Sequence, residues 1–457
     1  MLQRVDAWFN VSGRGSTLAG EITGGVTTFV AMAYIIFVNP AILGDPAGAA
    51  MDRGAVMMAT VLASGLASVL MGLLAGLPIA LAPGMGMNAL FSYTICAQMK
   101  VPWQTALGIV VISGVVFLML SLVKFREMVI RAVPDGLKFA AACGIGLFIA
   151  FIGLKNAGII VPDGATFVAF GPLWRPPVLL SLFALILTGV LVAFGVRGAI
   201  LVGLVAAGLA GYAFGVVKPM EGFVPNLAAV ALKADVRSAL SFAFIVPILT
   251  FLFFDMFDTV GTLMGVSEAA GLRRQDGGIP NAGAALACDA AGTVAGGLLG
   301  TSTVTSYIES AAGVAAGART GLAAVVTGVL FFLSIPLLRI VALFASPVPL
   351  EHTVVLGGAP HTVTLLLYPA TSAALVIVGF QMARVFPKIA WDDVSEGLPA
   401  FLTIIVMPLT FSISDGLAAG FVSYVILKLV RGKVHQVHPL LYVISAAIVL
   451  GYIAGKI

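Results

Sequence analysis

Charged residues are scarce in this chain of 457 residues: they make up 10% of it, whereas a soluble globular domain carries roughly 25%. This shortage excludes a soluble protein of ordinary composition. Cysteine is also rare, and Cys96, Cys143 and Cys288 stand in apolar stretches without CxxC spacing, so neither a disulfide framework nor a zinc site is expected. The net charge of +4 is small and dispersed, which argues against nucleic acid as a partner.

Apolar residues, by contrast, make up 60% of the chain, and its mean hydropathy is +1.11. Apolar runs of about 17–25 residues predict an all-α polytopic membrane protein with about 14 transmembrane spans, seven in each half. The N-terminus is too polar for a signal peptide, and its first residues predict a short surface helix. For the last apolar run, 439–457, an interfacial position and a further crossing both remain open. The predicted spans are residues 21–42, 55–77, 78–96, 104–124, 135–154, 177–196, 198–217, 240–266, 283–300, 302–318, 320–345, 366–386, 396–411 and 413–431.

The distribution of basic residues predicts the orientation of these spans. Most Lys and Arg residues fall on the side of the membrane that holds the N-terminus, with clusters at Lys124, Arg126 and Arg131 and at Arg273 and Arg274. An even number of spans then places both termini in the cytoplasm by the positive-inside rule. Because each half has an odd number of spans, the second half enters from the opposite side, which predicts a 7+7 inverted repeat.

Two predicted spans at matching positions of the halves are poor helices. The third, 78–96, opens with proline and glycine residues that include Pro83 and Gly84, and the tenth, 302–318, follows the hydroxyl-rich run 301–306. Proline and β-branched residues disfavour a continuous helix, so each is predicted to be a short extended segment followed by a half-helix. Matching broken segments point to a binding site near the membrane midplane.

Polar residues lie deep inside three apolar segments: Asp255 and Asp258 in the eighth span, Glu309 in the tenth, and Asn88 in the third. Asp255 and Asp258 are three residues apart and therefore share one helical face. A charged carboxylate at the centre of a membrane helix costs roughly 2.5–3.5 kcal/mol on insertion scales. These residues therefore predict a polar site inside the bundle, with a substrate or an ion as its partner.

The chemistry of these side chains suits a heterocycle with N–H and C=O edges. Carboxylates and carboxamides offer bidentate partners to such edges, and a carboxyl group at this depth is also able to carry a coupling proton. Structural alternatives stay open: Asp258 and Glu309 as interhelical hydrogen-bond partners, Asp255 as a group that only orients Asp258, Ser306 as a partner of irregular backbone, and Tyr307 as a packing aromatic.

Five stretches give the chain a resemblance to the AzgA-like purine permeases, a branch of the nucleobase–cation symporters with the uracil/xanthine permease fold. They run through nearly the whole chain and depart from the family pattern at no motif residue. These stretches are TTFVAMAYIIFVNPAIL (27–43), LPIALAPGMGMNAL (77–90), FFDMFDTVGTLMGV (253–266), GTSTVTSYIESAAGVAAGARTGL (300–322) and PAFLTIIVMPLTFSISDGLAAGF (399–421).

The resemblance implies roles for individual residues. It places the acidic substrate ligand of the eighth span at Asp258, with Asp255 as an adjacent carboxylate, and the acidic ligand of the tenth span at Glu309. It places the neighbouring aromatic position at Tyr307 and the polar position of the third span at Asn88. Ser306 joins them as a candidate base ligand, and the proton-coupling candidates are Asp258, Asp255 and Glu309.

The resemblance also implies a domain plan and a mechanism. Spans 1–4 and 8–11 form a core domain that slides like an elevator against a gate domain, spans 5–7 and 12–14, and two protomers touch through their gate domains. Adenine, guanine or hypoxanthine is imported through the plasma membrane with protons, without a cofactor or metal. The predicted divisions are 1–20 for the N-terminal segment, 21–130 and 236–346 for the core, 131–235 and 347–435 for the gate, and 436–457 for the tail.

Other functions remain to be weighed against this one. An intramembrane aspartyl protease, an enzyme, needs two Asp on different helices with a GxGD motif, whereas Asp255 and Asp258 share one helix and no GxGD occurs. A carrier of divalent anions favours basic ligands or bare helix N-termini, in conflict with the acids. Another nucleobase, xanthine or uracil, and sodium coupling are the alternatives within the transporter class.

Overall fold

The computed structural model describes residues 2–122, 133–218, 225–272, 279–344, 346–356 and 359–453. Within these ranges, ten helices are long and apolar enough to cross a membrane, and the apolar helices α10 (Ala199–Ala213) and α18 (Val394–Thr410) are shorter. The prediction of a helical polytopic membrane protein is confirmed. The predicted boundary between 130 and 131 and the residues Lys124, Arg126, Arg131, Arg273 and Arg274 lie outside the described ranges.

One group of helices combines elements from both halves of the chain. In it, α13 packs against α6 and α4, and α15 packs against α2 and α4. Small residues allow close approach: a Cβ built at Gly321 would lie 2.0 Å from the carbonyl oxygen of Gly72, so the two backbones touch at this position. The members of this group are α2 (Leu18–Met32), α3 (Ile35–Leu43), α4 (Arg53–Leu70), α6 (Trp103–Leu122), α12 (Ile245–Ala269), α13 (Ala282–Leu299), α15 (Gly321–Leu333) and α16 (Leu338–Phe344).

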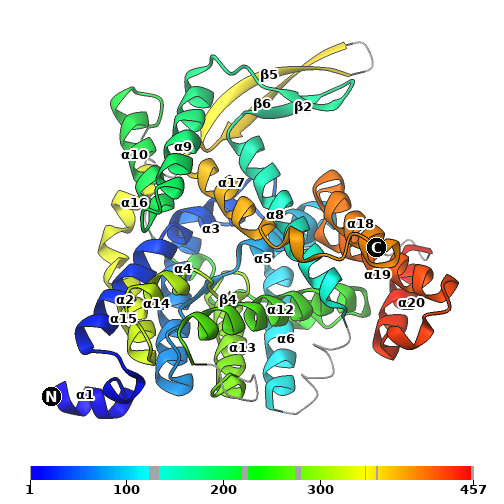
Figure 1. The fold of residues 1–457 in the computed structure, drawn as a ribbon. Coiled ribbons are helices and arrows are strands. Elements are labelled where there is room, and N and C mark those ends of the chain that lie inside the picture. The colour runs from blue at the N-terminus through cyan, green and yellow to red at the C-terminus, as the bar shows by residue number, and fades with distance from the viewer. Residues whose placement is uncertain are drawn as a thin grey trace.

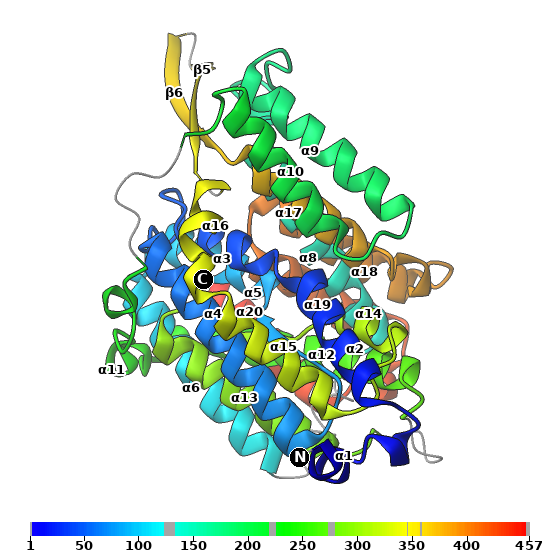
Figure 2. The ribbon, with the colours of Figure 1, turned by 90° about the vertical axis from the view of Figure 1, so that its left-hand side faces the viewer.

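A second group also draws on both halves. Helix α8 packs against α17 and α18, α9 packs against α10 and α17, and α18 packs against α19. In both ribbon views, α9 and α10 lie at the opposite end of the molecule from α6 and α13 (Figures 1 and 2). This group contains α8 (Asp135–Asn156), α9 (Pro176–Ala193), α10, α17 (Pro369–Ala383), α18 and α19 (Ile413–Val430), with α20 (Pro439–Ile453) against α19.

The third and tenth predicted spans are broken, as the sequence predicts. The third consists of strand β1 (Leu81–Pro83), helix α5 (Met85–Ala89) and a π-helical continuation over 90–98, and the tenth consists of β4 (Val304–Ser306) and α14 (Ser310–Ala315). The strands pair antiparallel, with Leu81 opposite Ser306. Because each strand supplies hydrogen-bond partners for the other, their non-helical backbone is satisfied inside the protein.

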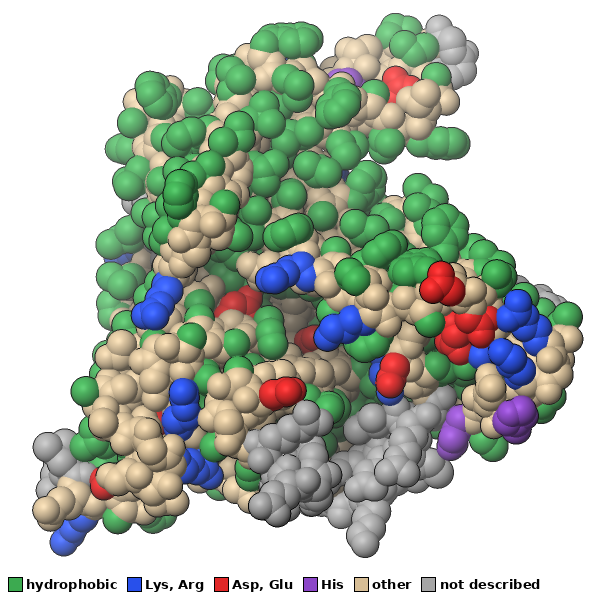
Figure 3. Space-filling model, in the orientation of Figure 1, with side chains coloured by type: hydrophobic (Ala, Val, Ile, Leu, Met, Phe, Trp, Pro, Cys, Tyr) green, Lys and Arg blue, Asp and Glu red, His purple; other side chains and the backbone are tan. Residues whose placement is uncertain are grey.

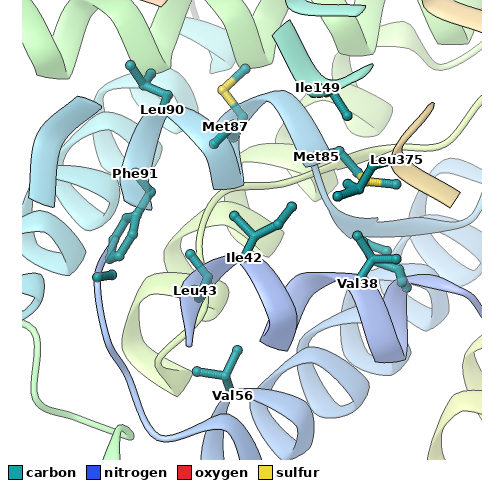
Figure 4. Packing of buried hydrophobic residues seen from close by; sticks show 14 of the residues in the cluster. Val38, Ile42, Leu43, Val56, Met85, Met87, Leu90, Phe91, Ile149 and Leu375 are labelled. Atoms are coloured by element: carbon teal, nitrogen blue, oxygen red, sulfur yellow. The ribbon is translucent and has the colours of Figure 1, made fainter. Parts of the chain in front are cut away.

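The largest apolar cluster joins the two groups. Figure 4 shows Val38 of α3 and Met85 of α5 on one side, with Ile149 of α8 and Leu375 of α17 facing them. These side chains are buried and carry no hydrogen-bonding groups. The contact between the groups at this level is therefore made by apolar packing.

Several elements differ from the sequence prediction. The chain is not entirely α-helical, because two hairpins lie outside the helix groups: β2 (Ile160–Asp163) with β3 (Phe167–Phe170), and β5 (Val348–Leu356) with β6 (Ala359–Leu367). The second projects from one end of the molecule (Figure 1), and its runs of valine and threonine are typical of strands. The first predicted span is two helices, α2 and α3. Two further short helices are α1 (Leu2–Phe9), as predicted, and α11 (Val236–Ala239).

Candidate substrate site

The paired strands β1 and β4 form the frame of the site, and α12 lies against β4. The backbone N–H of Tyr307 donates to the carbonyl of Ala80, and that of Gly84 donates to Thr303, each over 2.9 Å. The Tyr307 hydroxyl donates to the carbonyl oxygen of Pro83 over 2.6 Å. These bonds hold the start of each half-helix at a fixed distance from the other.

Asp258 is the carboxylate of α12 that remains accessible. Its side chain is exposed although neighbouring α12 residues are buried, and its Oδ2 accepts a hydrogen bond from Thr305 Oγ1 over 3.3 Å. The Thr305 hydroxyl also lies 2.9 Å from Thr259 Oγ1. Figure 3 shows a hollow in this face of the molecule, with acidic side chains in it and around it. Asp258 therefore offers a carboxylate oxygen to the space beside β4.

Glu309 approaches Asp258 from the broken segment. It directly precedes α14, is half-buried, and interacts electrostatically with Asp258. Its Oε1 accepts a hydrogen bond from the hydroxyl of Tyr34 over 2.5 Å. Tyr34 lies at the break between α2 and α3 and is fully buried. The bond holds the Glu309 carboxylate in a fixed position beside the site.

The remaining predicted ligands are buried in the frame. Asn88 and Ser306 are at most 2% exposed, and Tyr307 is 6% exposed. Asn88 accepts a hydrogen bond from the Ser302 hydroxyl, while Asn88 Nδ2 has no partner among the described residues. The structure thus brings these predicted residues to one region, where Asp258 is exposed, Glu309 is half-buried, and Asn88, Ser306 and Tyr307 are buried in contacts with neighbouring segments.

Asp255 is enclosed, and so is an acid that the sequence reasoning did not select, Asp289 of α13. Both side chains are 0% exposed. Asp255 Oδ2 accepts a hydrogen bond from Thr293 Oγ1 over 2.8 Å, and Asp289 Oδ1 accepts one from Ser306 Oγ over 2.9 Å. The signal for Asp289 was available, since it is a single carboxylate in the small-residue run ALACDAAGTVAGG (285–297).

No cation balances these acids in the part of the chain that the structure describes. Asp255, Asp258, Asp289 and Glu309 form no ion pair there, and no group of three His, Cys, Asp or Glu residues suited to a metal occurs there. A charge buried without a partner is costly. The arrangement is therefore suited to accept hydrogen bonds from N–H groups of a neutral ligand and to hold protons.

Comparisons with known proteins agree with this geometry. The sequence profile described as "Permease family" matches residues 19–419. The chain is 43% identical to a guanine/hypoxanthine permease of Bacillus subtilis over 98% of this chain and 99% of that protein. It is 38% identical to an adenine permease of Escherichia coli over 97% and 94%, and 46% identical to a putative permease of Methanocaldococcus jannaschii over 99% of both chains.

Solved structures support the fold. The transmembrane domain of a cyanobacterial bicarbonate transporter superposes with a TM-score of 0.62 at 16% identity, over 87% of this chain and 97% of that chain. The anion transporter SLC26A9 also superposes with a TM-score of 0.62, at 11% identity, over 91% of this chain and 66% of that chain. At these identities the likeness concerns the arrangement of the helices alone.

Proposed function

The chain belongs to the permease family, and from this premise we propose that it imports purine nucleobases, namely adenine, guanine or hypoxanthine, by proton symport. Its membership makes it a multi-pass transporter and not an enzyme, so the aspartyl protease alternative is set aside. Relatives along the full chain are described as guanine/hypoxanthine and adenine permeases. Guanine, hypoxanthine and adenine are all purines, and for this reason we propose a purine as the substrate.

The observation that carries the proposal is the pair of accessible carboxylates. Asp258 and Glu309 approach each other from α12 and from the broken tenth span, and carboxylates accept paired hydrogen bonds from N–H edges. We assign the N–H groups of the base to these two residues. Asn88, Ser306 and Tyr307 are assigned to the edge of the site, where they hold the strands that shape it.

The division into two helix groups supports an elevator mechanism. The core consists of the group that contains α12 and the broken spans, and the gate consists of the group around α8 and α17. Apolar packing between Met85 and Leu375, without hydrogen bonds, has no directional bonds to break when the groups slide. We assign fourteen spans by counting the two shorter apolar helices and the two broken segments with the ten candidate spans.

Polar contacts between the two groups are found at one end. Asp45, which accepts a hydrogen bond from Tyr93 of its own group over 2.8 Å, lies 4.0 Å from Lys155 Nζ of α8 in the other group. Arg53 of α4 hydrogen-bonds with the Tyr368 hydroxyl. With both termini in the cytoplasm this is the external end, so these contacts close the outer side of the carrier in this conformation.

We assign the binding of the coupling proton to a carboxyl group of the site, that of Asp258, Asp255 or Glu309, because the site holds more acids than a neutral base needs. No cofactor takes part. The alternatives are coupling to sodium and a different base, xanthine or uracil. The proposal includes a homodimer through the gate domains in the plasma membrane.

Uptake of labelled adenine, guanine, hypoxanthine, xanthine and uracil tests the proposal in a host that lacks its own nucleobase carriers. Each base is measured with and without a protonophore, and with sodium replaced by choline. Saturable purine uptake that collapses with the protonophore and in Glu309→Gln is expected. Glu351→Gln on the exposed strand β5 is the matched control and should transport normally. No uptake of any base by protein present in the membrane would contradict the proposal.

A further inference from the structure

Asp289 is a buried acid that base binding does not require. It lies on α13 with 0% exposure, and Ser306 occupies its Oδ1 over 2.9 Å. Its Oδ2 has no hydrogen-bond partner among the described residues. A buried polar atom without a partner costs about 1–3 kcal/mol, and more for a charged group, so this oxygen is expected to have a ligand.

Asp255, like Asp289, has one carboxylate oxygen in a hydrogen bond and one without a partner among the described residues. Thr293 occupies its Oδ2 over 2.8 Å, and its Oδ1 has no partner among the described residues. Thr293 lies four residues after Asp289, on the same face of α13, and the Asp255 and Asp289 carboxyl groups interact electrostatically. Each acid is thus anchored by a hydroxyl of the opposing segment and has one oxygen left unpaired.

A shared proton satisfies both open oxygens at once. A carboxyl group that keeps its proton donates to the neighbouring carboxylate, which reduces two buried negative charges to one. Two ionised carboxylates at this separation would repel each other in a medium of low dielectric constant. Two neutral carboxyl groups would lose the strong hydrogen bond to a charged acceptor.

Among the described residues, the elements packed around this pair bring no competing cation to it. On α12 the further charged neighbour of the pair is Asp258. Next to Asp289, the Cys288 thiol donates to the carbonyl of Leu70. Helices α5, α6 and α14 and strand β1, which also pack here, carry no ionisable side chain, and α4 carries only Arg53, at the end where it contacts Tyr368.

A chain of hydroxyls joins the enclosed pair to the accessible side. Asp289 lies beside Thr259, the Thr259 hydroxyl lies 2.9 Å from that of Thr305, and Thr305 donates to Asp258 over 3.3 Å. A proton that arrives at Asp258 passes along this chain when each hydroxyl accepts one proton and releases its own. Both threonines are regenerated, and the net change is one proton moved from Asp258 to Asp289.

We propose that the coupling proton is bound between Asp255 and Asp289, as one proton shared by two carboxyl groups, while Asp258 and Glu309 bind the base. This inference rests on the proposed function and assigns its ion site. The proton site is separate from the base site, and the hydroxyls of Thr259 and Thr305 link the two. Binding of the base at Asp258 therefore controls access to the proton site.

Transport by Asp255→Asn and Asp289→Asn, made separately and placed in lipid vesicles, tests the proposal. Tritiated adenine, guanine and hypoxanthine are the probes. With one proton per base, wild-type accumulation should change about tenfold per pH unit of imposed gradient. Each variant should still bind the base and exchange internal for external base, but its accumulation ratio should fall to one and its exchange should not depend on pH. Glu309→Gln should lose binding itself.

The outcomes distinguish a failure of the shared-proton site from a failure of the proposed transport of bases. Either variant still accumulating base in a protonophore-sensitive way would overturn the shared-proton site. A wild-type carrier that accumulates base without sensitivity to protons would overturn it too, while the base-carrier function would stand. Absence of wild-type transport of every base would overturn the proposed function instead.

The variant Thr259→Val tests the hydroxyl path, because it keeps both acids. It should slow proton-coupled uptake at least tenfold and leave exchange unchanged, and an unchanged uptake rate would overturn the hydroxyl path.

Infrared spectroscopy supplies a measurement that needs no transport. Wild-type protein and Glu309→Gln should both show the C=O band of a protonated carboxyl group, and this band should be missing in whichever of Asp255→Asn and Asp289→Asn reaches the membrane. A wild-type spectrum without a protonated carboxyl band at neutral pH would overturn the proposal.

Discussion

Replacement of Tyr34 by phenylalanine is expected to weaken binding of the base without unfolding the protein. The substitution keeps the buried ring and removes the hydroxyl that donates to Glu309 over 2.5 Å. A hydrogen bond to a charged acceptor contributes about 1.5–3 kcal/mol, which corresponds to a loss of about 10- to 150-fold in affinity. Without this donor the Glu309 carboxylate is no longer held in place, so it does not present a fixed acceptor to the base.

Equilibrium binding of tritiated base to the purified protein measures the effect. Tyr424→Phe is the matched control, since Tyr424 is also a buried tyrosine whose hydroxyl donates to a carboxylate, that of Glu396, over 3.4 Å, in the second helix group. The control should bind the base like the wild type. An unchanged affinity of Tyr34→Phe, or an equal loss in both variants, would refute the role given to the bond with Glu309.

Three further predictions concern stability, each measured by thermal unfolding in detergent. Glu396→Gln removes the anion that lies 2.7 Å from Lys428, a lysine that is 2% exposed. This substitution should lower the free energy of unfolding by about 3–5 kcal/mol. Adding Lys428→Met to the same chain should restore most of that loss. Gly313→Ala places a Cβ 2.1 Å from a threonine oxygen of α2 and should lower the free energy of unfolding by about 1–3 kcal/mol. Its control is Gly261→Ala, where the added Cβ has no atom within 4 Å; this substitution should raise the free energy of unfolding by up to about 1 kcal/mol. Hydrogen bonds from the backbone and side chain two residues later hold the pKa of Asp393 well below its ordinary value. Asp393→Asn should therefore lower Tm at neutral pH, and the difference should shrink as the pH falls below about 4, because the stabilisation requires the carboxylate and is lost on acidification.

The sequence was most informative where membrane physics leaves few choices. Apolar runs located the spans because a bilayer of fixed thickness demands helices of a minimum length. Proline and glycine near Pro83, and the hydroxyl run 301–306, located the two breaks because neither suits a helix. Asp258 and Glu309 were found because an acid inside an apolar run is costly enough to need a reason.

Other features needed three-dimensional contacts. The pairing of β1 with β4 could not be derived from three-residue strands, whose pattern is too short to show a period. Tyr34 looked like one aromatic among many until its hydroxyl was seen beside Glu309. Accessibility separates Asp258 from Asp255, and it depends on how α13 covers α12. Asp289 was visible as an acid in an apolar run but was not selected, and its partner on α12 is known only from the structure.

The strand pair also has a consequence for the biosynthesis of the protein. The Tyr307 hydroxyl bonds to Pro83, 224 residues earlier in the chain, and the strands at these positions satisfy each other's backbone. During synthesis β1 reaches the membrane long before β4 leaves the ribosome, and exposed strand backbone is not tolerated in lipid. The third span must therefore wait in a hydrated or protein-lined place until the tenth arrives. Assembly of the site is thus a late step of insertion, and chains that stop before β4 are natural targets for membrane quality control.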